Sequence, residues 1–450
     1  MTLAIALLGA AAVVSFAIRK RLAAVGPFTV VALAIAIVRV LTLEAGSLED
    51  VFGLQLRVTP LAQLATLILL GSLALIVLAV WLDEPAYNFF PTALAAGAAV
   101  LGVVTLTVPI AIYAVLLLAL LVPVGSFTFQ VTRNRSADAA YRHYSFVALG
   151  GSLGMAALAL AGGLPREQPP TTFVLLLAII VVAFALKLAA IPFHTHAALL
   201  ASEVPASALA LYFGVLVPTT FIAFAEILTD SGLLPAIVEV ANVQDLLLGI
   251  GMLSALGGAF LATGSTELRR VAVYSVIADL GLALVGIATL SGPGIIGAIA
   301  VALISGAGAT QQLIAAGAIE RRAGTDTPSA TVAPLAALAF VIGGFAMIGA
   351  PPLVAFPGHF FVELIAFSYS GTVGALLIIA TLFILIAQLR AAMSIFRVAP
   401  ERWRVERRPI AGVVGAIMFL ALLAGGMQPD AFLGPIATFA AEFIRALRPL

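Results

Sequence analysis

The sequence predicts an all-α membrane protein with about fourteen transmembrane helices, and three observations support this fold class. Of the 450 residues, 63% are hydrophobic and only 10% are charged, whereas a soluble domain is about half apolar and about a quarter charged. The mean hydropathy is +1.20. The apolar residues form long continuous runs, as bilayer-spanning helices require, instead of the alternating pattern of a membrane β-barrel.

Each helix is predicted from an apolar run of about 20 residues, the length that spans the hydrocarbon core. The first run ends in Arg19-Lys20-Arg21 and has no basic residues before it, so we interpret it as a span and not as a cleavable leader. The runs leave no room for a soluble domain. The helices are expected near residues 2–17, 25–43, 61–82, 89–108, 110–129, 145–163, 172–192, 206–229, 243–263, 270–290, 295–317, 331–350 with a continuation to 371, 372–394 and 410–427.

Basic residues orient these helices, because most of the 22 Lys and Arg residues fall on odd-numbered connections. The positive-inside rule places such connections in the cytoplasm. Both termini are therefore expected on the non-cytoplasmic side of the cell (inner) membrane. The residues that set this orientation are Arg19, Lys20, Arg21, Arg133, Arg135, Arg142, Arg269, Arg270, Arg321, Arg322, Arg390, Arg397, Arg402, Arg404, Arg407 and Arg408.

Helices seven and twelve share a pattern that predicts an internal repeat. Phe184–His194 (FALKLAAIPFH) and Phe345–His359 (FAMIGAPPLVAFPGH) are both apolar, both break at proline and both carry polar residues beside the break. Each is the fourth helix of a five-helix unit, helices 4–8 and 9–13, and an offset of five helices inverts the membrane topology. Inverted repeats with broken helices are typical of transporters, although membrane helices also tolerate ordinary proline kinks.

This pattern divides the chain into four segments. An N-terminal three-helix segment at 1–88 precedes the first five-helix repeat at 89–229. The inverted second repeat follows at 243–394. The last helix and a short tail, Gln428–Leu450, belong to the segment 395–450.

Lys187 is the first candidate for proton transfer. It is the one charged residue in the apolar run Val174–Ile191, and Pro192 breaks the helix soon after it. A charged side chain near the bilayer centre costs about 2.5–3.5 kcal/mol, so it is rarely there without a role. A buried lysine can change its protonation state readily, as a proton carrier must. The structural alternative is a lysine that snorkels or forms a fixed pair.

Asp279 and His359 are the next candidates. Asp279 lies midway through the predicted helix 270–290, where an ionised carboxylate needs a partner. It could instead stay neutral through a hydrogen bond to Ser275 or to another neighbour. The imidazole of His359 titrates near neutral pH and could relay protons, or it could stabilise the helix break.

Three more residues complete the candidate set: His194, Glu363 and Glu226. His194 lies beside the first break, where we expect it to donate a stabilising hydrogen bond or to join a relay. Glu363 follows His359 by four residues, so both share a helix face and could form a local pair. Glu226 lies near a predicted membrane edge, where it could join the path, snorkel or contact a partner.

The composition excludes several kinds of site. With no cysteine, the chain cannot form disulfides, iron–sulfur clusters or thiolate-bound zinc. His194 and His196 are two residues apart and do not share a helical face, so they make a poor metal or haem pair. We find no quinone, flavin, nucleotide or nucleic-acid motif. We therefore expect no cofactor, no metal and no catalytic residue.

Three motifs resemble one known family. Lys187, Ile191–His196 (IPFHTH) and Glu203–Ala208 (EVPASA) resemble a stretch of the antiporter-like subunits of respiratory complex I and of Mrp-type sodium/proton antiporters. Glu267–Ala278 (ELRRVAVYSVIA) and Gly349–Phe360 (GAPPLVAFPGHF) resemble two further segments of these subunits, in the same order. The resemblance covers roughly residues 58–395. It implies a non-catalytic membrane subunit that moves protons inside a larger redox-driven or hydrogenase-like complex, together with other membrane subunits and with or without a peripheral redox arm.

The sequence also departs from this family at its central ionisable positions. Leu118, in Leu116–Pro123, stands where the family has glutamate, and predicted helix eight has no lysine or histidine. Ser305–Gln312 (SGAGATQQ) replaces the family's HxxxK pattern. His359 stands where lysine or glutamate is usual, and Asp279 where histidine is usual. The central polar axis is therefore depleted.

Two alternatives to proton translocation remain open at this stage. One is a structural subunit that has lost conduction and joins its neighbours. The other is the membrane half of an ion-driven uptake system for inorganic carbon. The sequence does not distinguish protons from sodium ions.

Overall fold

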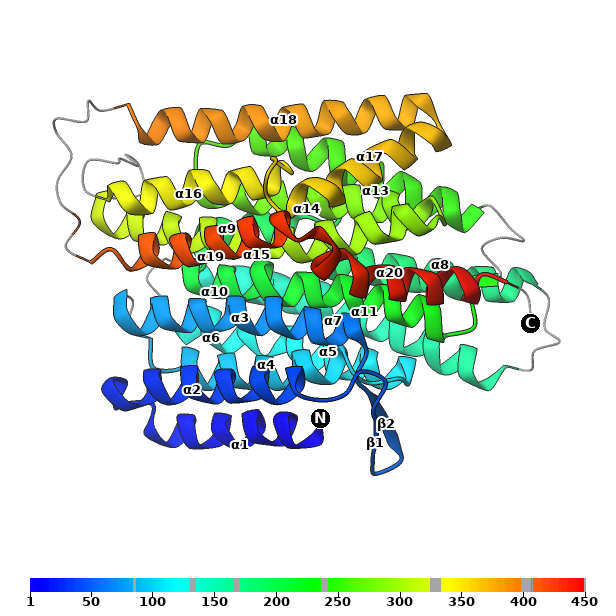
Figure 1. The fold of residues 1–450 in the computed structure, drawn as a ribbon, viewed down its shortest axis with the longest axis horizontal. Helices are drawn as coiled ribbons and strands as arrows, with labels where there is room; N and C mark the ends of the chain where they lie inside the picture. Colours follow the sequence, from blue (N-terminus) through cyan, green and yellow to red (C-terminus); the bar gives the residue numbers. More distant parts are fainter. Residues whose placement is uncertain are drawn as a thin grey trace.

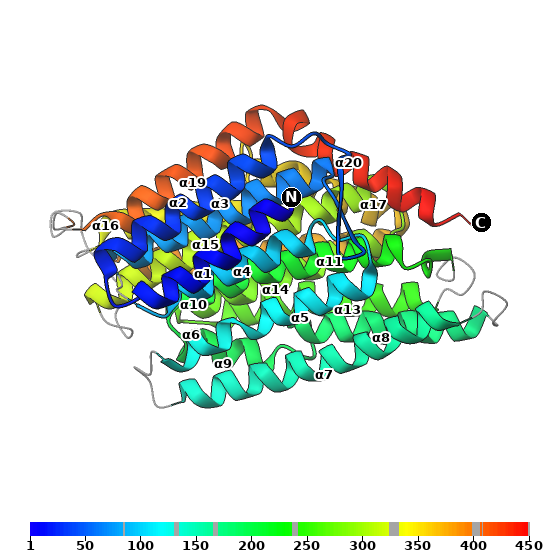
Figure 2. The same ribbon diagram turned by 90° about the horizontal axis from the view of Figure 1, so that it is seen from below.

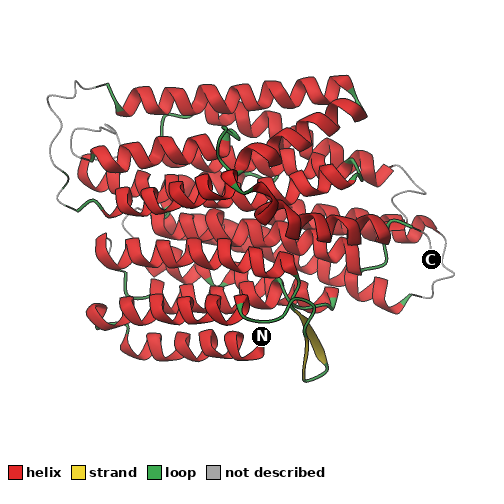
Figure 3. Ribbon diagram, viewed as in Figure 1, coloured by secondary structure: helices red, strands yellow, loops and turns green. Residues whose placement is uncertain are grey.

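A computed structural model of the chain describes residues 1–83, 86–129, 135–164, 170–235, 242–323, 333–397, 406 and 408–448. Helices make up almost all of these residues and run side by side along the long axis of the molecule (Figures 1 and 3). In the N-terminal half, the elements are α1 (Thr2–Ile18), α2 (Leu22–Leu41), β1 (Leu48–Val51), β2 (Leu54–Arg57), α3 (Pro60–Asp83), α4 (Phe89–Val103), α5 (Pro109–Leu121), α6 (Pro123–Phe129), α7 (Ser136–Gly163), α8 (Pro170–Lys187), α9 (Thr195–Glu203), α10 (Ala206–Leu211), the π-helix η1 (Tyr212–Leu216) and α11 (Val217–Asp230). In the C-terminal half, they are α13 (Asn242–Gly264), α14 (Leu268–Ala288), α15 (Gly292–Ala323), α16 (Pro334–Met347), α17 (Ala355–Tyr369), α18 (Gly371–Ile395), α19 (Ile410–Met427) and α20 (Pro429–Ala446).

The prediction of a helical membrane protein is confirmed. Within the described residues, ten helices are long and apolar enough to cross a membrane, and four shorter helices of 10–17 residues are also apolar. Their apolar character follows from the long runs of Leu, Ala, Val and Ile in the sequence. The protein is therefore a multi-pass membrane protein.

Two elements correct the sequence-based prediction. Between α2 and α3, strands β1 and β2 pair antiparallel to form a hairpin that projects from the bundle (Figure 3), so the fold is not purely α-helical. The residues expected to be a short tail form the helix α20, which buries Phe432, Phe439 and Phe443 against the bundle. α20 packs on α3, α11 and α15.

The predicted interruptions of helices seven and twelve are both present, and both first halves end in the same way. At the end of α8, the Ala190 N–H donates to the Ala185 carbonyl at 2.9 Å, and φ of Ala189 is +54°. At the end of α16, the Ala350 N–H donates to the Phe345 carbonyl at 3.0 Å, and φ of Gly349 is +64°. These are the bonds and the left-handed residue of a Schellman-type helix ending.

Neighbouring helices supply partners for backbone groups that the interruptions free. The Tyr212 hydroxyl donates to the Lys187 carbonyl at 3.2 Å, and the Ile191 N–H donates to Ser254 Oγ at 2.9 Å. The Val354 N–H donates to the Leu422 carbonyl of α19 at 3.0 Å. Lipid offers no such partners, so both interruptions are suited to the protein interior.

The 32-residue helix α15 is the central element of the bundle. It packs against α10, η1 and α11 of the first half and against α14, α16 and α17 of the second half. At the crossing with η1, a Cβ on Gly306 would lie 2.7 Å from the Gly214 carbonyl, so the two backbones touch. The two halves are therefore packed on one shared helix.

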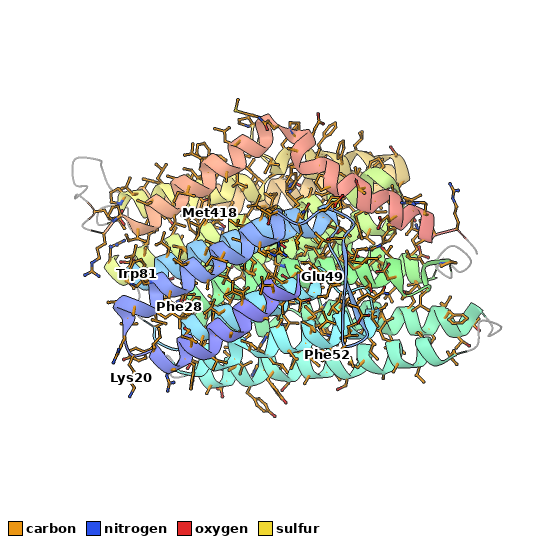
Figure 4. All side chains as sticks on the ribbon, turned by 60° about the horizontal axis from the view of Figure 1, so that its bottom comes forward. Lys20, Phe28, Glu49, Phe52, Trp81 and Met418 are labelled. Atoms are coloured by element: carbon orange, nitrogen blue, oxygen red, sulfur yellow. The ribbon has the colours of Figure 1, made fainter. Side chains whose placement is uncertain are left out.

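Ion pairs join helix ends on the predicted cytoplasmic side. Arg322 contacts Asp83 at 3.3 Å and Glu406 at 2.6 Å, and Arg269 contacts Glu320 at 2.9 Å. Lys20 lies at the end of the bundle away from Glu49 and Phe52 of the hairpin (Figure 4). Among the orienting basic residues, Arg133, Arg402, Arg404 and Arg407 lie outside the described residues.

Candidate functional site

Lys187 is fully buried and its ammonium group faces two aromatic rings. Its Nζ donates to the Tyr113 hydroxyl, which in turn donates to the Gly150 carbonyl. The same Nζ lies 3.7 Å from the ring centre of Tyr113 and 5.5 Å from that of Phe184. A phenol oxygen and two ring faces thus surround the ammonium, and ring faces attract cations.

Glycines of α7 create the space for this pocket. A Cβ on Gly154 would overlap the Tyr113 ring, and a Cβ on Gly150 would lie 2.8 Å from the Ala183 carbonyl. The sequence ALGGSLGM therefore allows α5 and α8 to approach α7 closely, and α7 and α8 lie side by side in Figure 2.

Leu118 does not face Lys187. Its side chain is 62% exposed on the outside of the bundle, five residues from Tyr113 on α5. At 3.6 residues per turn, five residues rotate the side chain by about 140° around the helix. Tyr113, and not Leu118, thus lies beside Lys187.

Asp279 and His359 form a second buried pair. The His359 Nε2 lies 3.5 Å from the Asp279 Oδ1, and the His359 Nδ1 lies 3.1 Å from the Ala355 carbonyl. Because a carbonyl only accepts, Nδ1 carries a proton and a neutral imidazole would present Nε2 as an acceptor. An ionised Asp279 carboxylate, which can only accept hydrogen bonds, would then face a second acceptor, the His359 Nε2, in a buried site. Within the described residues, neither Asp279 oxygen nor the His359 Nε2 forms a hydrogen bond, and a proton shared by the two side chains would satisfy this buried pair.

Ser275 does not bond to Asp279, so of the two partners considered for this carboxyl group, Ser275 or another neighbour, the first is wrong. The Ser275 hydroxyl accepts from the Gln388 amide at 3.1 Å, and the Gln312 amide donates to Gln388 Oε1 at 2.7 Å. Gln312 also donates to the Phe340 carbonyl at 3.1 Å. These amides therefore link α14, α15, α16 and α18 one helical turn from Asp279.

Glu363 lies one turn beyond His359 on α17. Its Oε1 accepts from the Thr381 hydroxyl of α18 at 2.8 Å. The local pair expected between Glu363 and His359 is thus replaced by two separate contacts, although the two side chains remain electrostatic neighbours. A line of polar side chains runs through this half of the protein: Gln312, Gln388, Ser275, Asp279, His359, Glu363 and Thr381.

Glu226 is buried, with 7% of its surface exposed, so it does not snorkel as one interpretation suggested. Its charged neighbours are Asp230, Arg57 and Glu442, and Arg57 contacts Glu442 at 3.7 Å. This acidic group joins α11, the hairpin and α20 near the predicted non-cytoplasmic end. It is separate from the aromatic contacts of Lys187.

His194 directly precedes α9, with its ring centre 6.4 Å from that of Tyr274. Sequence reasoning missed Tyr113, Tyr212 and Gln388, which are buried in apolar spans, and His143, which is buried in the polar first turns of α7. Of these, only Gln388 is marked by a strongly polar side chain inside an apolar run. Within the described ranges, no group of three or more His, Asp or Glu side chains is placed to hold a metal ion.

Comparison with known proteins identifies relatives of this chain. Residues 144–384 match the family described as NADH:quinone oxidoreductase/Mrp antiporter, transmembrane. A 280-residue stretch is 29% identical to NADH-quinone oxidoreductase subunit 13 of Thermus thermophilus, covering 59% of this chain and 57% of that protein. The aligned region thus spans little more than half the length of that relative.

Two solved structures share the fold over nearly the whole chain. One is a chain of the membrane-bound sulfane sulfur reductase, an archaeal respiratory membrane complex, with a TM-score of 0.85, 18% identity and coverage of 99% of both chains. The other is a chain of the Mrp complex from Dietzia sp. DQ12-45-1b, with a TM-score of 0.83, 17% identity and coverage of 99% of this chain and 100% of that chain.

Proposed function

Because the chain belongs to the NADH:quinone oxidoreductase/Mrp antiporter transmembrane family, we propose that it is a proton-translocating, antiporter-like subunit of a multi-subunit, redox-driven membrane complex. One observation carries this proposal: two buried ionisable sites each lie next to an interrupted helix. Lys187 is the last residue of α8, and His359 lies in the second turn of α17 against Asp279. Buried ionisable groups are costly in a membrane, and two of them at helix breaks favour ion movement over packing.

The matching ends of α8 and α16 support the inverted repeat and the fourteen crossings. The hydrogen bond between Ala185 and Ala190 at the end of α8 is equivalent to the one between Phe345 and Ala350 at the end of α16. Fourteen crossings would result if the four shorter apolar helices of the described residues span the membrane together with the ten long ones. In this pairing Lys187 corresponds to Met347, so the second repeat, at 243–394, uses Asp279 and His359 from α14 and α17 instead of a lysine.

In the proposed mechanism, each buried site takes up and releases one proton. The Tyr113 hydroxyl and the ring faces stabilise Lys187 while it is an ammonium, and release leaves a neutral amine. The proton held between Asp279 and His359 moves toward Glu363 and Thr381, in the direction of the end of α17 that is predicted to be non-cytoplasmic. Charge at one site alters the proton affinity of the next, because charges interact strongly away from water.

One set of contacts favours the alternative, a structural subunit without conduction. Gln312 and Gln388 bind each other and a backbone carbonyl where the family has an ionisable residue, and such amides carry no proton. A subunit that only joined its neighbours would keep this network and would not need Lys187.

The proposal includes partners and a location. We infer contacts with other membrane subunits of a hetero-oligomeric complex in the inner membrane, since the similar chains come from respiratory and Mrp complexes. A peripheral redox arm would supply the energy. Both termini would lie on the non-cytoplasmic side.

Proton flux through the reconstituted complex tests this function. The intact complex is purified by a tag on this chain and sealed into liposomes that contain a pH-sensitive dye. We expect Lys187→Met to abolish coupled flux while the complex still assembles. Unchanged flux in Lys187→Met would instead support the structural subunit.

A further inference from the structure

A second group of buried imidazoles lies between Lys187 and the predicted cytoplasmic side. α5 runs toward the cytoplasm in the predicted topology, and Leu120 lies seven residues beyond Tyr113 on it. At about 1.5 Å per residue, this places Leu120 about 10 Å nearer the cytoplasm than the Lys187 pocket. The His143 Nε2 lies 3.2 Å from the Leu120 carbonyl, so His143 is at that depth.

Backbone carbonyls fix the tautomers of two rings in this group. The His143 Nε2 must donate to the Leu120 carbonyl, because a carbonyl only accepts. The His196 Nδ1 lies 3.0 Å from the Phe193 carbonyl and must donate in the same way. Each neutral ring therefore keeps its second nitrogen as a proton acceptor. Among the described residues, the His196 Nε2 has no hydrogen-bond partner although it is buried.

The two rings are neighbours and connect to the Lys187 pocket. His143 on α7 and His196 on α9 have ring centres 5.8 Å apart, and both side chains are fully buried. His143 also packs edge-on against Tyr212, with ring centres 4.7 Å apart. Tyr212 donates its hydroxyl to the Lys187 carbonyl at 3.2 Å. Ring packing thus links His196, His143 and Tyr212, and one hydrogen bond joins Tyr212 to the Lys187 backbone.

We propose that His143 and His196 form the relay through which protons reach Lys187 from the cytoplasmic side. This inference rests on the proposed function, and it identifies the residues at which protons enter the subunit. A proton that binds the accepting nitrogen of one ring makes it an imidazolium, and the ring becomes neutral again when the proton moves on. The relay therefore consumes no group and needs no cofactor.

Two substitutions can separate a purely structural role of these rings from a role in proton transfer. A glutamine at position 143 can place an amide nitrogen near the Nε2 position, and an asparagine at position 196 can place one near the Nδ1 position. Each amide can donate to the same carbonyl, yet it cannot carry a proton. His143→Gln and His196→Asn thus keep the structural bond and remove the relay.

The test measures proton flux in liposomes containing the intact complex while pH is varied on the cytoplasmic side alone. In both variants we expect flux to fall about a hundredfold, in keeping with the loss of a proton-transfer group, and to lose its dependence on cytoplasmic pH. Tyr144→Phe, an exposed neighbour on α7, is the matched control and should retain flux. Wild-type flux with an unchanged pH profile in both variants would overturn the relay.

The same experiment separates this proposal from the function on which it rests. If Lys187→Met abolishes flux while His143→Gln and His196→Asn do not, the subunit translocates protons by another entry. If the wild-type complex translocates no protons, both proposals are wrong. If a variant fails to assemble, nitrogen-15 NMR of the histidine ring nitrogens in the wild-type complex tests the relay instead. If the relay exists, the ring nitrogens of His143 and His196 exchange protons during turnover. If both rings keep one neutral tautomer throughout turnover, the relay is excluded.

Discussion

The His359 Nε2 faces the Asp279 Oδ1 across 3.5 Å, and both side chains are buried between α14 and α17. Because His359 donates its other nitrogen to the Ala355 carbonyl, a proton is needed between the pair to avoid two opposed acceptors. The Ser305 hydroxyl lies beside the same carboxyl group. We therefore propose that these two side chains, which are separate in sequence, act as one protonation site.

Asp279→Asn should abolish proton flux without preventing assembly. The asparagine amide can donate to the His359 Nε2, so the pair keeps a hydrogen bond, but the amide cannot hold an exchangeable carboxyl proton. We expect flux to fall about a hundredfold, measured in liposomes with a pH-sensitive dye. Asp245→Asn changes an exposed carboxylate on α13 and serves as the control. Normal flux in Asp279→Asn would remove this pair from the path.

Tyr113→Phe should destabilise the Lys187 pocket. The change leaves the Lys187 ammonium and the Gly150 carbonyl without the hydroxyl they share, and such a loss in a buried site costs about 1–3 kcal/mol. We expect a lower midpoint of thermal unfolding in detergent and slower proton flux. Tyr141→Phe, on the 73% exposed Tyr141, should change neither quantity.

Gly154→Val should displace Tyr113 from Lys187. The new side chain would occupy the space of the Tyr113 ring, and overpacking of this kind costs about 1–3 kcal/mol. Thermal unfolding of the purified complex measures the loss. Gly162→Val, on the same helix with open space around its Cα, is the matched control. Equal stability of the two variants would show that α7 adjusts without cost.

Acidification should release the N-terminus from the hairpin only at low pH. Hydrogen bonds from the Met1 amino group and from Thr2 lower the pKa of Glu49 from its ordinary value of 4.5 to about 2. A lowered pKa means that the contact stabilises the folded state fully above about pH 4.5 and loses its effect as pH falls toward 2. Hydrogen exchange of the first turn of α1, compared at pH 6 and pH 3, measures this. In Glu49→Gln, the first turn of α1 should no longer lose protection from exchange between pH 6 and pH 3. If the loss of protection persists, it is due to another group.

The proposed orientation can be tested because the chain has no cysteine. Lys20→Cys should be protected from a membrane-impermeant thiol reagent added outside intact cells, since positive residues stay in the cytoplasm. Phe52→Cys, at the exposed tip of the hairpin, should be labelled. The reverse pattern would invert the topology.

The sequence predicted the parts of this fold that depend on local hydrophobicity. Continuous apolar runs located the helices, and Pro192 and Pro351 marked the two interruptions. It did not predict α20, because a helix with apolar residues on one face only has a moderate mean hydropathy. The hairpin was missed because its strands have four residues each.

The residues of the candidate site could be proposed one by one from the sequence, but their pairing could not. Lys187, Asp279 and His359 were found because ionisable groups are rare in membrane spans. Their partners depend on contacts between distant parts of the chain, and Tyr113 is 74 positions from Lys187. An aromatic residue in an apolar run gives no local signal, so Tyr113 was overlooked.

The shared packing of both halves on α15 limits how any ion can cross. A carrier that works by alternating access needs two bodies that rock against each other. Here the backbones of Gly214 and Gly306 touch, and α20 braces α3, α11 and α15 from outside. Such a frame resists rocking, so under the proposed function turnover would depend on small rotations of side chains and on transient hydration around them. In that case protons would pass from one side chain to the next while the helices keep their positions.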